Sequence, residues 1–465
     1  MLLFRSSRMR ACLALAAFVI AGSAQTAAQS IRDTDLYRRI RSEVDKIWIV
    51  DTHEHLADEE TYLKRPADFL ARMLHYVDAD LMASGMPRVS TSDPAVILRV
   101  QDPAIPLEER VPLFLRHWQF VKTTGYGRAL TRVVKDLYGT DIDQLTPESC
   151  RELNRRIAAA NTPGLYRQIL KDKARIDVSI AVSRQPRDPD YFRRVVRFDH
   201  YVRAGSRKDL DAIAAATGVP IRSLADVVHA LEVEFDRAVK DGAVGVKSAL
   251  AYDRTLSFPR VTEAEADAAF TRLSNTPGRA PGVGAAPTTP DVRPYGDYLM
   301  HRICDQAARH KLPFQIHTGL QTGGPHVIAD ANPALLTDLF LAHPEVNFIL
   351  LHTYPYGHTA GALAKMFPNV YLDLTWLYII SPRVAEDSLA EFIETVPGNK
   401  ILGFGGDYGY VEGIYAHAVM ARDVIAAVLA RKVQDRYLTE AEAGQLAARL
   451  LRTNALELYK LPSQK

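Results

Sequence analysis

The chain has 465 residues, of which 47% are hydrophobic and 24% are charged. These proportions exclude a disordered, collagen-like or disulfide-scaffold protein. The 57 Lys and Arg residues nearly balance the 55 Asp and Glu residues, for a formal net charge of +2, so there is no basic excess to indicate nucleic-acid binding. The length allows two or three domains, or one long α/β barrel.

The first 28 residues have the order of a secretory signal peptide. Three arginines precede an apolar run over residues 11–21, and small residues follow it. This order predicts export to the periplasm or secretion, with cleavage after Ala24 or Ala28. The run is too short to span a bilayer comfortably, and no longer apolar run follows, so we expect no membrane span after cleavage. Cleavage after Ala28 would change the net charge from +2 to −1. An uncleaved anchor or a misassigned start codon is the alternative.

Three cysteines are present, and Cys12 lies inside the predicted leader. Cys150 and Cys304 could form one disulfide at most, and the sequence does not place them within bonding distance. We expect both to be unpaired and structural. Two thiols are too few for a cysteine-based metal site.

Seven short segments have the apolar, β-branched pattern of buried strands, and helical patterns lie between several of them. In chain order they cover residues 46–55, 175–182, 242–250, 312–319, 346–353, 369–376 and 400–407. Residues 77–85, with the sequence VDADLMASG, are a weaker eighth candidate. Strands that alternate with helices indicate a parallel α/β sheet.

Eight such units predict a (β/α)8 TIM barrel with helical insertions over residues 32–460. A doubly wound open sheet is the alternative, but it usually binds its ligand near one strand crossing. Here polar residues end strands throughout the chain, as around a barrel mouth. A barrel needs about 250 residues, so we expect large insertions at 85–174, 183–242 and 254–294.

Two of these insertions contain segments of distinctive composition. Residues 275–294 are rich in Pro, Gly and Ala and predict a loop. Residues 117–139 have a helical pattern and are placed to cap the barrel mouth.

The first predicted strand ends in DTHEH, which contains His53 and His55. Residues i and i+2 of a strand share a face, so both imidazoles would project into the barrel mouth within reach of one metal ion. Imidazole and carboxylate ligands suit zinc and similar divalent ions, with a position left open for water. The sequence therefore predicts a metal centre at the carboxyl ends of the strands.

Four later strands end in residues that suit the same centre. His317, His352 and Asp407 each follow an apolar run. Lys247 ends the run AVGVK, where it shares an inward face with the small residues Ala243 and Gly245. Asp407 has one alternative role as a helix N-cap, which Asp favours.

This constellation resembles the amidohydrolase superfamily of metal-dependent TIM-barrel hydrolases, over about residues 36–460. Further motifs resemble its amidohydrolase-related branch, also called amidohydrolase 2. That branch includes the amidohydrolase part of nodulin/glutamine-synthetase-like proteins, and uronate isomerases and decarboxylases are more distantly similar. The motifs are IHTGLQTG at 316–323, NP at 332–333, HTYPYG at 352–357, FPNVYLDLTW at 367–376 and GFGGDY at 403–408.

The resemblance implies roles for the candidate residues of the site. His53 and His55 would bind the metal, and Asp407 would lie at or beside it. Asp407 would also accept a proton from a metal-activated water and pass it to the leaving group.

The number of ions decides the remaining roles. In a one-ion site, His317 would bind the same ion, Lys247 would hold a substrate carboxylate and His352 would polarise the substrate carbonyl. In a two-ion site, a carboxylated Lys247 would bridge the ions, and His317 and His352 would hold the second. Members of the branch often use one ion, which favours the first arrangement.

The sequence therefore predicts an exported, metal-dependent hydrolase, with zinc as its expected metal. It would cleave an amide-type C–N bond of a small carboxylate-bearing substrate, with Lys247, Arg254 and Gln321 as substrate-binding residues. Uronate-isomerase-like or decarboxylase chemistry on the same site is the alternative. A metal-bound binding protein without turnover is a third hypothesis. We expect the protein to bind a small molecule and no nucleic acid, and the sequence is compatible with a homo-oligomer.

Overall fold

The computed structural model describes residues 30–89, 96–276, 290–323 and 326–462. The predicted signal peptide lies outside these residues, and so does most of the predicted loop at 275–294. Cys150 and Cys304 are both buried and free, which confirms that they are unpaired.

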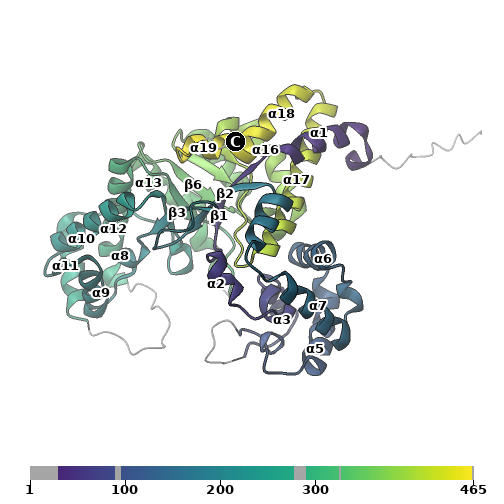
Figure 1. The fold of residues 1–465 in the computed structure, drawn as a ribbon. Coiled ribbons are helices and arrows are strands. Elements are labelled where there is room, and N and C mark those ends of the chain that lie inside the picture. The colour runs from purple at the N-terminus through teal and green to yellow at the C-terminus, as the bar shows by residue number, and fades with distance from the viewer. Residues whose placement is uncertain (1–29, 90–95, 277–289, 324–325, 463–465) are drawn as a thin grey trace, which may run out of the picture.

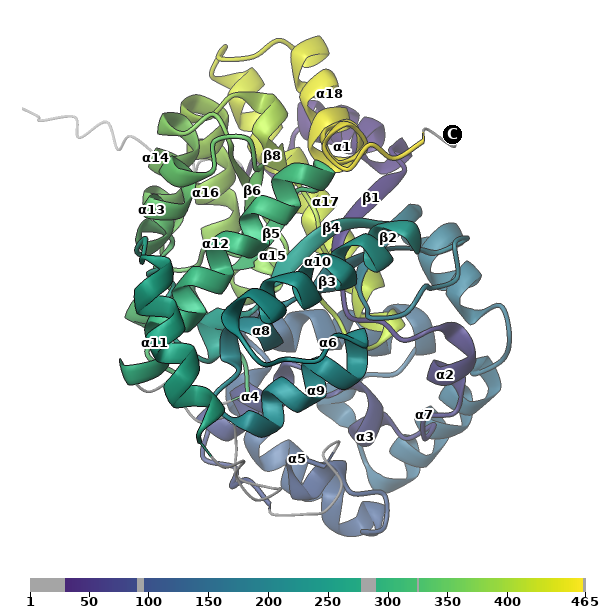
Figure 2. The same ribbon diagram turned by 90° about the vertical axis from the view of Figure 1, so that its left-hand side faces the viewer.

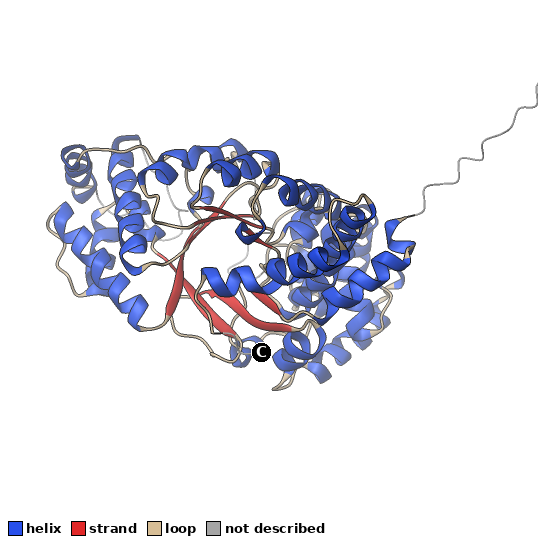
Figure 3. Cartoon of the chain, turned by 90° about the horizontal axis from the view of Figure 1, so that it is seen from above, coloured by secondary structure: helices blue, strands red, loops and turns tan. Residues whose placement is uncertain are grey.

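Eight parallel strands form one sheet in the order in which they occur in the chain. Beyond the last strand, Thr52 N on the first strand donates to Phe404 O at 3.0 Å and so brings the two edges together. The fold is a (β/α)8 TIM barrel, as predicted, and Figure 3 shows its strands surrounded by helices. The strands are β1 (Ile49–Glu54), β2 (Ile176–Val182), β3 (Phe192–Arg197), β4 (Ala243–Ser248), β5 (Phe314–His317), β6 (Phe348–Leu351), β7 (Val370–Asp373) and β8 (Ile401–Leu402).

The strand predicted weakly at 77–85 is wrong, because this segment forms a helix, α4 (Val77–Ala83). Its buried apolar residues Val77 and Leu81 are four positions apart, which is a helical spacing. The missing strand is β3, which lies inside the segment 183–242 that was predicted to be an insertion. Its sequence, FRRVVR, contains three arginines that obscure the apolar pattern.

The long insertion between β1 and β2 is helical, as predicted. Figures 1 and 2 show α3, α5 and α7 gathered beyond one end of the barrel, and α1 and α18 beyond the other. The helices up to β2 are α1 (Asp35–Lys46), α2 (Glu59–Leu63), α3 (Phe69–Met73), α4, α5 (Leu107–Val121), α6 (Gly125–Tyr138) and α7 (Pro147–Ala160).

The later helices cover the outside of the barrel and its base. Two short π-helical segments, Arg167–Lys173 and Arg449–Thr453, accompany them. These helices are α8 (Asp199–Arg203), α9 (Arg207–Thr217), α10 (Leu224–Lys240), α11 (Glu263–Ser274), α12 (Arg293–His310), α13 (Thr337–Ala342), α14 (Gly357–Met366), α15 (Leu377–Ile380), α16 (Pro382–Thr395), α17 (Val411–Gln434), α18 (Glu440–Ala448) and α19 (Asn454–Leu458).

The protein has two apolar cores. The larger one lies between the sheet and the surrounding helices and includes Phe314, Phe348 and Val246. The smaller one fills the barrel, where Val195, Leu402 and residues of the other strands pack against Ala455 and Tyr459 from the end of the chain. The C-terminal segment therefore closes the base of the barrel.

Helix α17 is apolar and long enough, by length and composition alone, to cross a membrane. It is 78% buried in its most apolar window and packs against α1, α6 and α16. The composition of α17 is therefore that of a core helix of this barrel.

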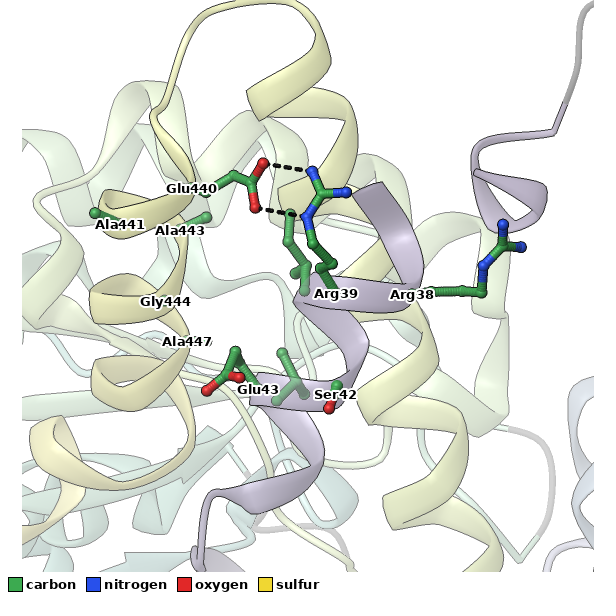
Figure 4. A pocket seen from close by; sticks show the side chains of 11 residues that line it. Arg38, Arg39, Ser42, Glu43, Glu440, Ala441, Ala443, Gly444 and Ala447 are labelled. Carbon is green, nitrogen blue, oxygen red and sulfur yellow. Dashed lines mark hydrogen bonds and ion pairs between the residues drawn. The ribbon is translucent and has the colours of Figure 1, made fainter. Parts of the chain in front are cut away.

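A groove of about 590 Å³ lies between α1 and α18 (Figure 4). Arg39 spans it with two hydrogen bonds to Glu440, of 2.6 and 3.1 Å. None of the residues predicted for the metal centre lines this groove. This groove is therefore separate from the predicted metal centre.

Candidate metal centre

The predicted metal-binding residues meet at the carboxyl ends of the strands. His53 lies near the end of β1, His317 ends β5 and His352 directly follows β6. Asp407 follows β8 after a short loop, and Lys247 lies near the end of β4. All five are at least 96% buried. His55, whose side chain is 46% exposed, connects the cluster to solvent.

His53, His55 and Asp407 form the tightest group. The Nε2 atoms of His53 and His55 lie 3.5 and 3.1 Å from Oδ1 of Asp407. One possible ligand atom from each of these three residues lies within 4.8 Å of those from the other two, which is the spacing of a metal site. Among the described residues, His317 is not part of this group. Two imidazoles and a carboxylate fit a divalent ion such as zinc, with one position left open.

His317 and His352 present two lone pairs to each other. His352 Nδ1 donates to Thr375 O at 3.1 Å, and His317 Nε2 donates to Leu320 O at 2.9 Å. A neutral imidazole has only one N–H, so the two nitrogens that face each other at 3.1 Å both carry lone pairs. Two lone pairs that face each other repel, and a cation bound by both nitrogens would remove this repulsion. The facing lone pairs of His317 and His352 are therefore a second observation that fits a metal ion.

Asp407 lies between the histidine pair His53 and His55 on one side and His352 on the other. Its Oδ1 faces His53 and His55, and its Oδ2 lies 3.6 Å from Nε2 of His352. Burial alone would raise the pKa of Asp407, but the hydrogen bond from His55 and the nearby imidazoles hold it well below its usual value. Asp407 is thus a carboxylate at neutral pH, as a metal ligand or a general base must be.

The alternative role of Asp407 as a helix N-cap is wrong. Helix α17 begins at Val411, its N-cap residue is Tyr410, and no side chain caps it by a hydrogen bond. Asp407 instead has a left-handed backbone, with φ of +57°, as do His352 and Trp376. Such strain is typical of functional sites, where the surrounding structure holds it in place.

Two buried carboxylates hold the backbone on either side of Asp407. Oδ1 of Asp51 accepts the N–H of Gly406 at 2.9 Å, and Oε1 of Glu54 accepts the N–H of Tyr408 at 2.5 Å. This supporting role of Asp51 and Glu54 was not predicted from the sequence. The sequence signal for this support was the presence of two acids in a strand that the structure shows to be buried throughout.

Lys247 lies inside the barrel mouth, as predicted, and is 3% exposed. Burial lowers its pKa to about 7, although Asp407 opposes this change. Its amine is thus partly neutral at physiological pH. Arg197, which sequence reasoning missed, is its partner in the β3–β4 register and is paired with Asp199.

Two other predicted substrate-binding residues have partners within the fold. The guanidinium of Arg254 pairs with Asp297 on α12 at 2.5 Å and donates to two neighbouring backbone carbonyls. Gln321 is buried and donates to Ala251 O at 2.8 Å. These contacts stabilise the loops after β4 and β5, and the predicted substrate contacts of Arg254 and Gln321 stay predictions.

An aromatic wall stands beside His352. The ring of Trp376 lies 5.2 Å from the His352 ring, Tyr76 stacks on Trp376 at 4.8 Å, and Tyr126 stacks on Tyr76 at 5.3 Å. Tyr76 also donates to the backbone carbonyl of Asp407. Tyr126 belongs to α6, so the predicted helical segment 117–139, which the structure divides into α5 and α6, reaches the wall of the site.

The sequence from residue 177 to residue 461 matches the amidohydrolase family. The chain belongs to this family. Its N-terminal part, with His53 and His55, precedes the matched residues, and the structure brings both imidazoles to Asp407 inside the match. The predicted resemblance to amidohydrolases is therefore confirmed.

Two curated proteins are similar in sequence to this chain. Protein fluG of Emericella nidulans is 32% identical over 237 residues, which are 49% of this chain but only 27% of fluG. The chain thus spans about a quarter of that relative, which fits the resemblance to the nodulin/glutamine-synthetase-like group. A uronate isomerase of Rhizorhabdus wittichii is 22% identical over 91% of this chain and 95% of its own length.

Solved structures share the fold at lower sequence identity. A uronate isomerase of Thermotoga maritima has a TM-score of 0.72 at 15% identity and covers 91% of this chain and 97% of its own. A protein of Lactobacillus casei, provisionally named as a metal-dependent hydrolase, has a TM-score of 0.63 at 19% identity. It covers 90% of this chain and 97% of its own. These likenesses establish the barrel and leave the reaction open.

Proposed function

We propose that this protein is a metal-dependent hydrolase that cleaves an amide-type C–N bond of a small, carboxylate-bearing substrate. The observation that carries the proposal is the group formed by His53, His55 and Asp407 at the barrel mouth, with a carboxylate 3.1 to 3.5 Å from two imidazole nitrogens. Membership of the amidohydrolase family supports it.

The site contains the parts that such a reaction needs. A divalent ion, when bound by His53, His55 and Asp407, supplies a water of lowered pKa and a Lewis acid for the scissile carbonyl. Asp407 accepts the proton of the attacking water and delivers it to the leaving nitrogen. The aromatic wall around Trp376 excludes water from one side of the substrate.

We further propose a second ion between His317 and His352, in place of the one-ion site that the sequence favoured. Their facing lone pairs support this arrangement, and so does the absence of His317 from the tight ligand group of the described residues. Lys247, with its pKa near 7, has the neutral amine that carboxylation requires. It would then bridge the two ions.

Metal analysis of the wild type and of Lys247→Ala tests the ion count. We expect about two zinc ions per wild-type chain and about one in the variant, because the bridging ligand is lost. A wild type with one ion, together with a Lys247→Ala variant that keeps it and mainly shows a raised KM, would restore the one-ion arrangement.

A substrate screen on metal-replete protein tests the reaction. N-acyl and γ-glutamyl compounds should release an amine, whereas uronates and aromatic acids should be left unchanged. Isomerisation of a uronate without bond cleavage would favour the second candidate, a uronate isomerase. That candidate is supported by the uronate isomerase of Rhizorhabdus wittichii, which aligns over nearly the whole chain. Tight ligand binding without product over hours would favour a binding protein.

Export remains part of the proposal because the N-terminal segment has the order of a signal peptide. N-terminal sequencing of the protein from a cell-envelope fraction should find a chain that begins near Gln25 or Gln29. An intact Met1 on cytoplasmic protein would contradict export.

A further inference from the structure

Gln315 lies on β5 inside the barrel and is fully buried. Its Oε1 is 2.8 Å from Nδ1 of His53, and its Nε2 donates to Thr52 O at 2.7 Å and to the Tyr459 hydroxyl at 2.6 Å. The carbonyl of Thr52 can only accept a hydrogen bond, so the amide nitrogen must face it. The amide oxygen of Gln315 must then face His53.

This orientation decides where His53 carries its proton. An amide oxygen only accepts, so Nδ1 of His53 must be the donating nitrogen. In a neutral imidazole the other nitrogen then has the lone pair. That nitrogen, Nε2, faces Asp407 at 3.5 Å, where the metal would be bound. Gln315 therefore holds His53 in the tautomer and the ring orientation of a metal ligand.

Tyr459 supports Gln315 from the base of the barrel. It directly follows α19, is 3% exposed and belongs to the inner core. The barrel has room for its ring because β4 has a glycine there: a Cβ added to Gly245 would lie 3.3 Å from Cε1 of Tyr459. Hydrogen bonds thus run from the C-terminal end of the chain through Gln315 to His53.

We propose that Gln315 and Tyr459 are positioning residues of the metal centre and set its affinity for metal. The partner that accepts the second N–H of a metal-binding histidine fixes its tautomer, and the loss of such a partner typically costs about 10- to 100-fold in metal affinity. Here that partner is an amide, whose orientation is fixed by the carbonyl of Thr52 and which is also held by the hydroxyl of Tyr459. This inference rests on the proposed metal-dependent function.

The test measures zinc affinity on the full-length chain, stripped of metal and titrated against a chromophoric chelator. Gln315→Leu should weaken zinc binding about 10- to 100-fold and alter the visible absorption spectrum of the cobalt-substituted protein. Tyr459→Phe should weaken it less, because Thr52 O still holds the amide. Gln315→Glu keeps an acceptor for His53 and should bind zinc more tightly than Gln315→Leu, which a packing role alone would not predict.

Two matched controls lie outside the barrel interior. Gln306→Leu removes a buried amide on α12, and Tyr201→Phe removes a buried hydroxyl that donates to Glu234 at 2.9 Å. Both should bind zinc like the wild type.

Unchanged zinc affinity in Gln315→Leu and Tyr459→Phe would overturn this inference alone. If Gln315→Leu does not fold, Tyr459→Phe decides by the same criterion. A wild type that binds no divalent ion would overturn the proposed function and this inference with it.

Discussion

The two ends of the barrel have opposite chemistry. At the mouth, buried polar side chains face one another, and the backbone is left-handed at His352 and Asp407. At the base, apolar strand residues pack against Tyr459, and regular backbone pairing continues. Tyr459 belongs to the base, yet it is connected to the metal centre through Gln315. Residues that stabilise the fold and residues that suit chemistry thus occupy different ends of one barrel, as is general for this fold.

The largest effect should come from removing a metal ligand at the mouth. His53→Ala should lose the ion held with His55 and Asp407, and activity should fall to background. Metal analysis after gel filtration, together with an activity assay, checks this. His343→Ala is a suitable control, because His343 is buried against His301 at 2.8 Å and lies outside the metal group. A His53→Ala variant that retains full metal content would contradict the proposed ligand set.

A smaller loss should follow when the mouth keeps its metal but loses its base. Asp407→Asn should fold normally, since Asn tolerates the left-handed backbone at this position. It should keep at least one ion, and kcat should fall by about 10²- to 10⁴-fold, as for the loss of a general acid–base group. Steady-state kinetics at neutral pH measures this. Near wild-type turnover would remove Asp407 from the mechanism.

His417, whose Nδ1 lies 3.0 Å from the carbonyl of Gly406 next to Asp407, should make the stability of the fold depend on pH. Burial lowers the pKa of His417 from 6.5 to about 4, so the unfolded chain takes up a proton at this residue at a higher pH than the folded protein. Its contribution therefore favours unfolding increasingly as the pH falls from about 6.5 to about 4. His417→Gln should narrow the loss of Tm between pH 7 and pH 4 relative to the wild type, measured on metal-free protein. Parallel Tm curves would rule out this role.

The smallest effect should come from the base of the barrel, and it should be seen as a loss of stability. Gly245→Ala would place a Cβ 3.0 Å from Pro313 O and 3.1 Å from the Val195 side chain. Such overpacking typically costs about 1–3 kcal/mol, so urea denaturation should show a lower midpoint for the variant. In the control Gly444→Ala on α18, an added Cβ meets nothing within 4 Å. Equal stability of the Gly245→Ala variant and the wild type would show that the base has spare room.

Seven of the eight strands could be predicted because their apolar runs are short, β-branched and bounded by polar residues. The exception is instructive: β3 has three arginines in six residues, and the pattern alone does not separate it from a helix. Residues 77–85 were predicted to be a strand but form a helix, because a short apolar run fits either a strand or a helix turn. Tertiary packing decided both cases.

The sequence alone determined the kinds of side chains at the candidate site and the strands that carry them, because an apolar run that ends in His or Asp defines both. Only the tertiary structure decided how these side chains are oriented. It placed a carboxylate between two imidazole groups, turned the lone pairs of His317 and His352 toward each other, and engaged Arg254 with Asp297. It also brought Tyr459 to Gln315, 144 residues apart in the chain. Hydrogen-bond direction depends on which groups meet in space, and sequence spacing does not contain that information.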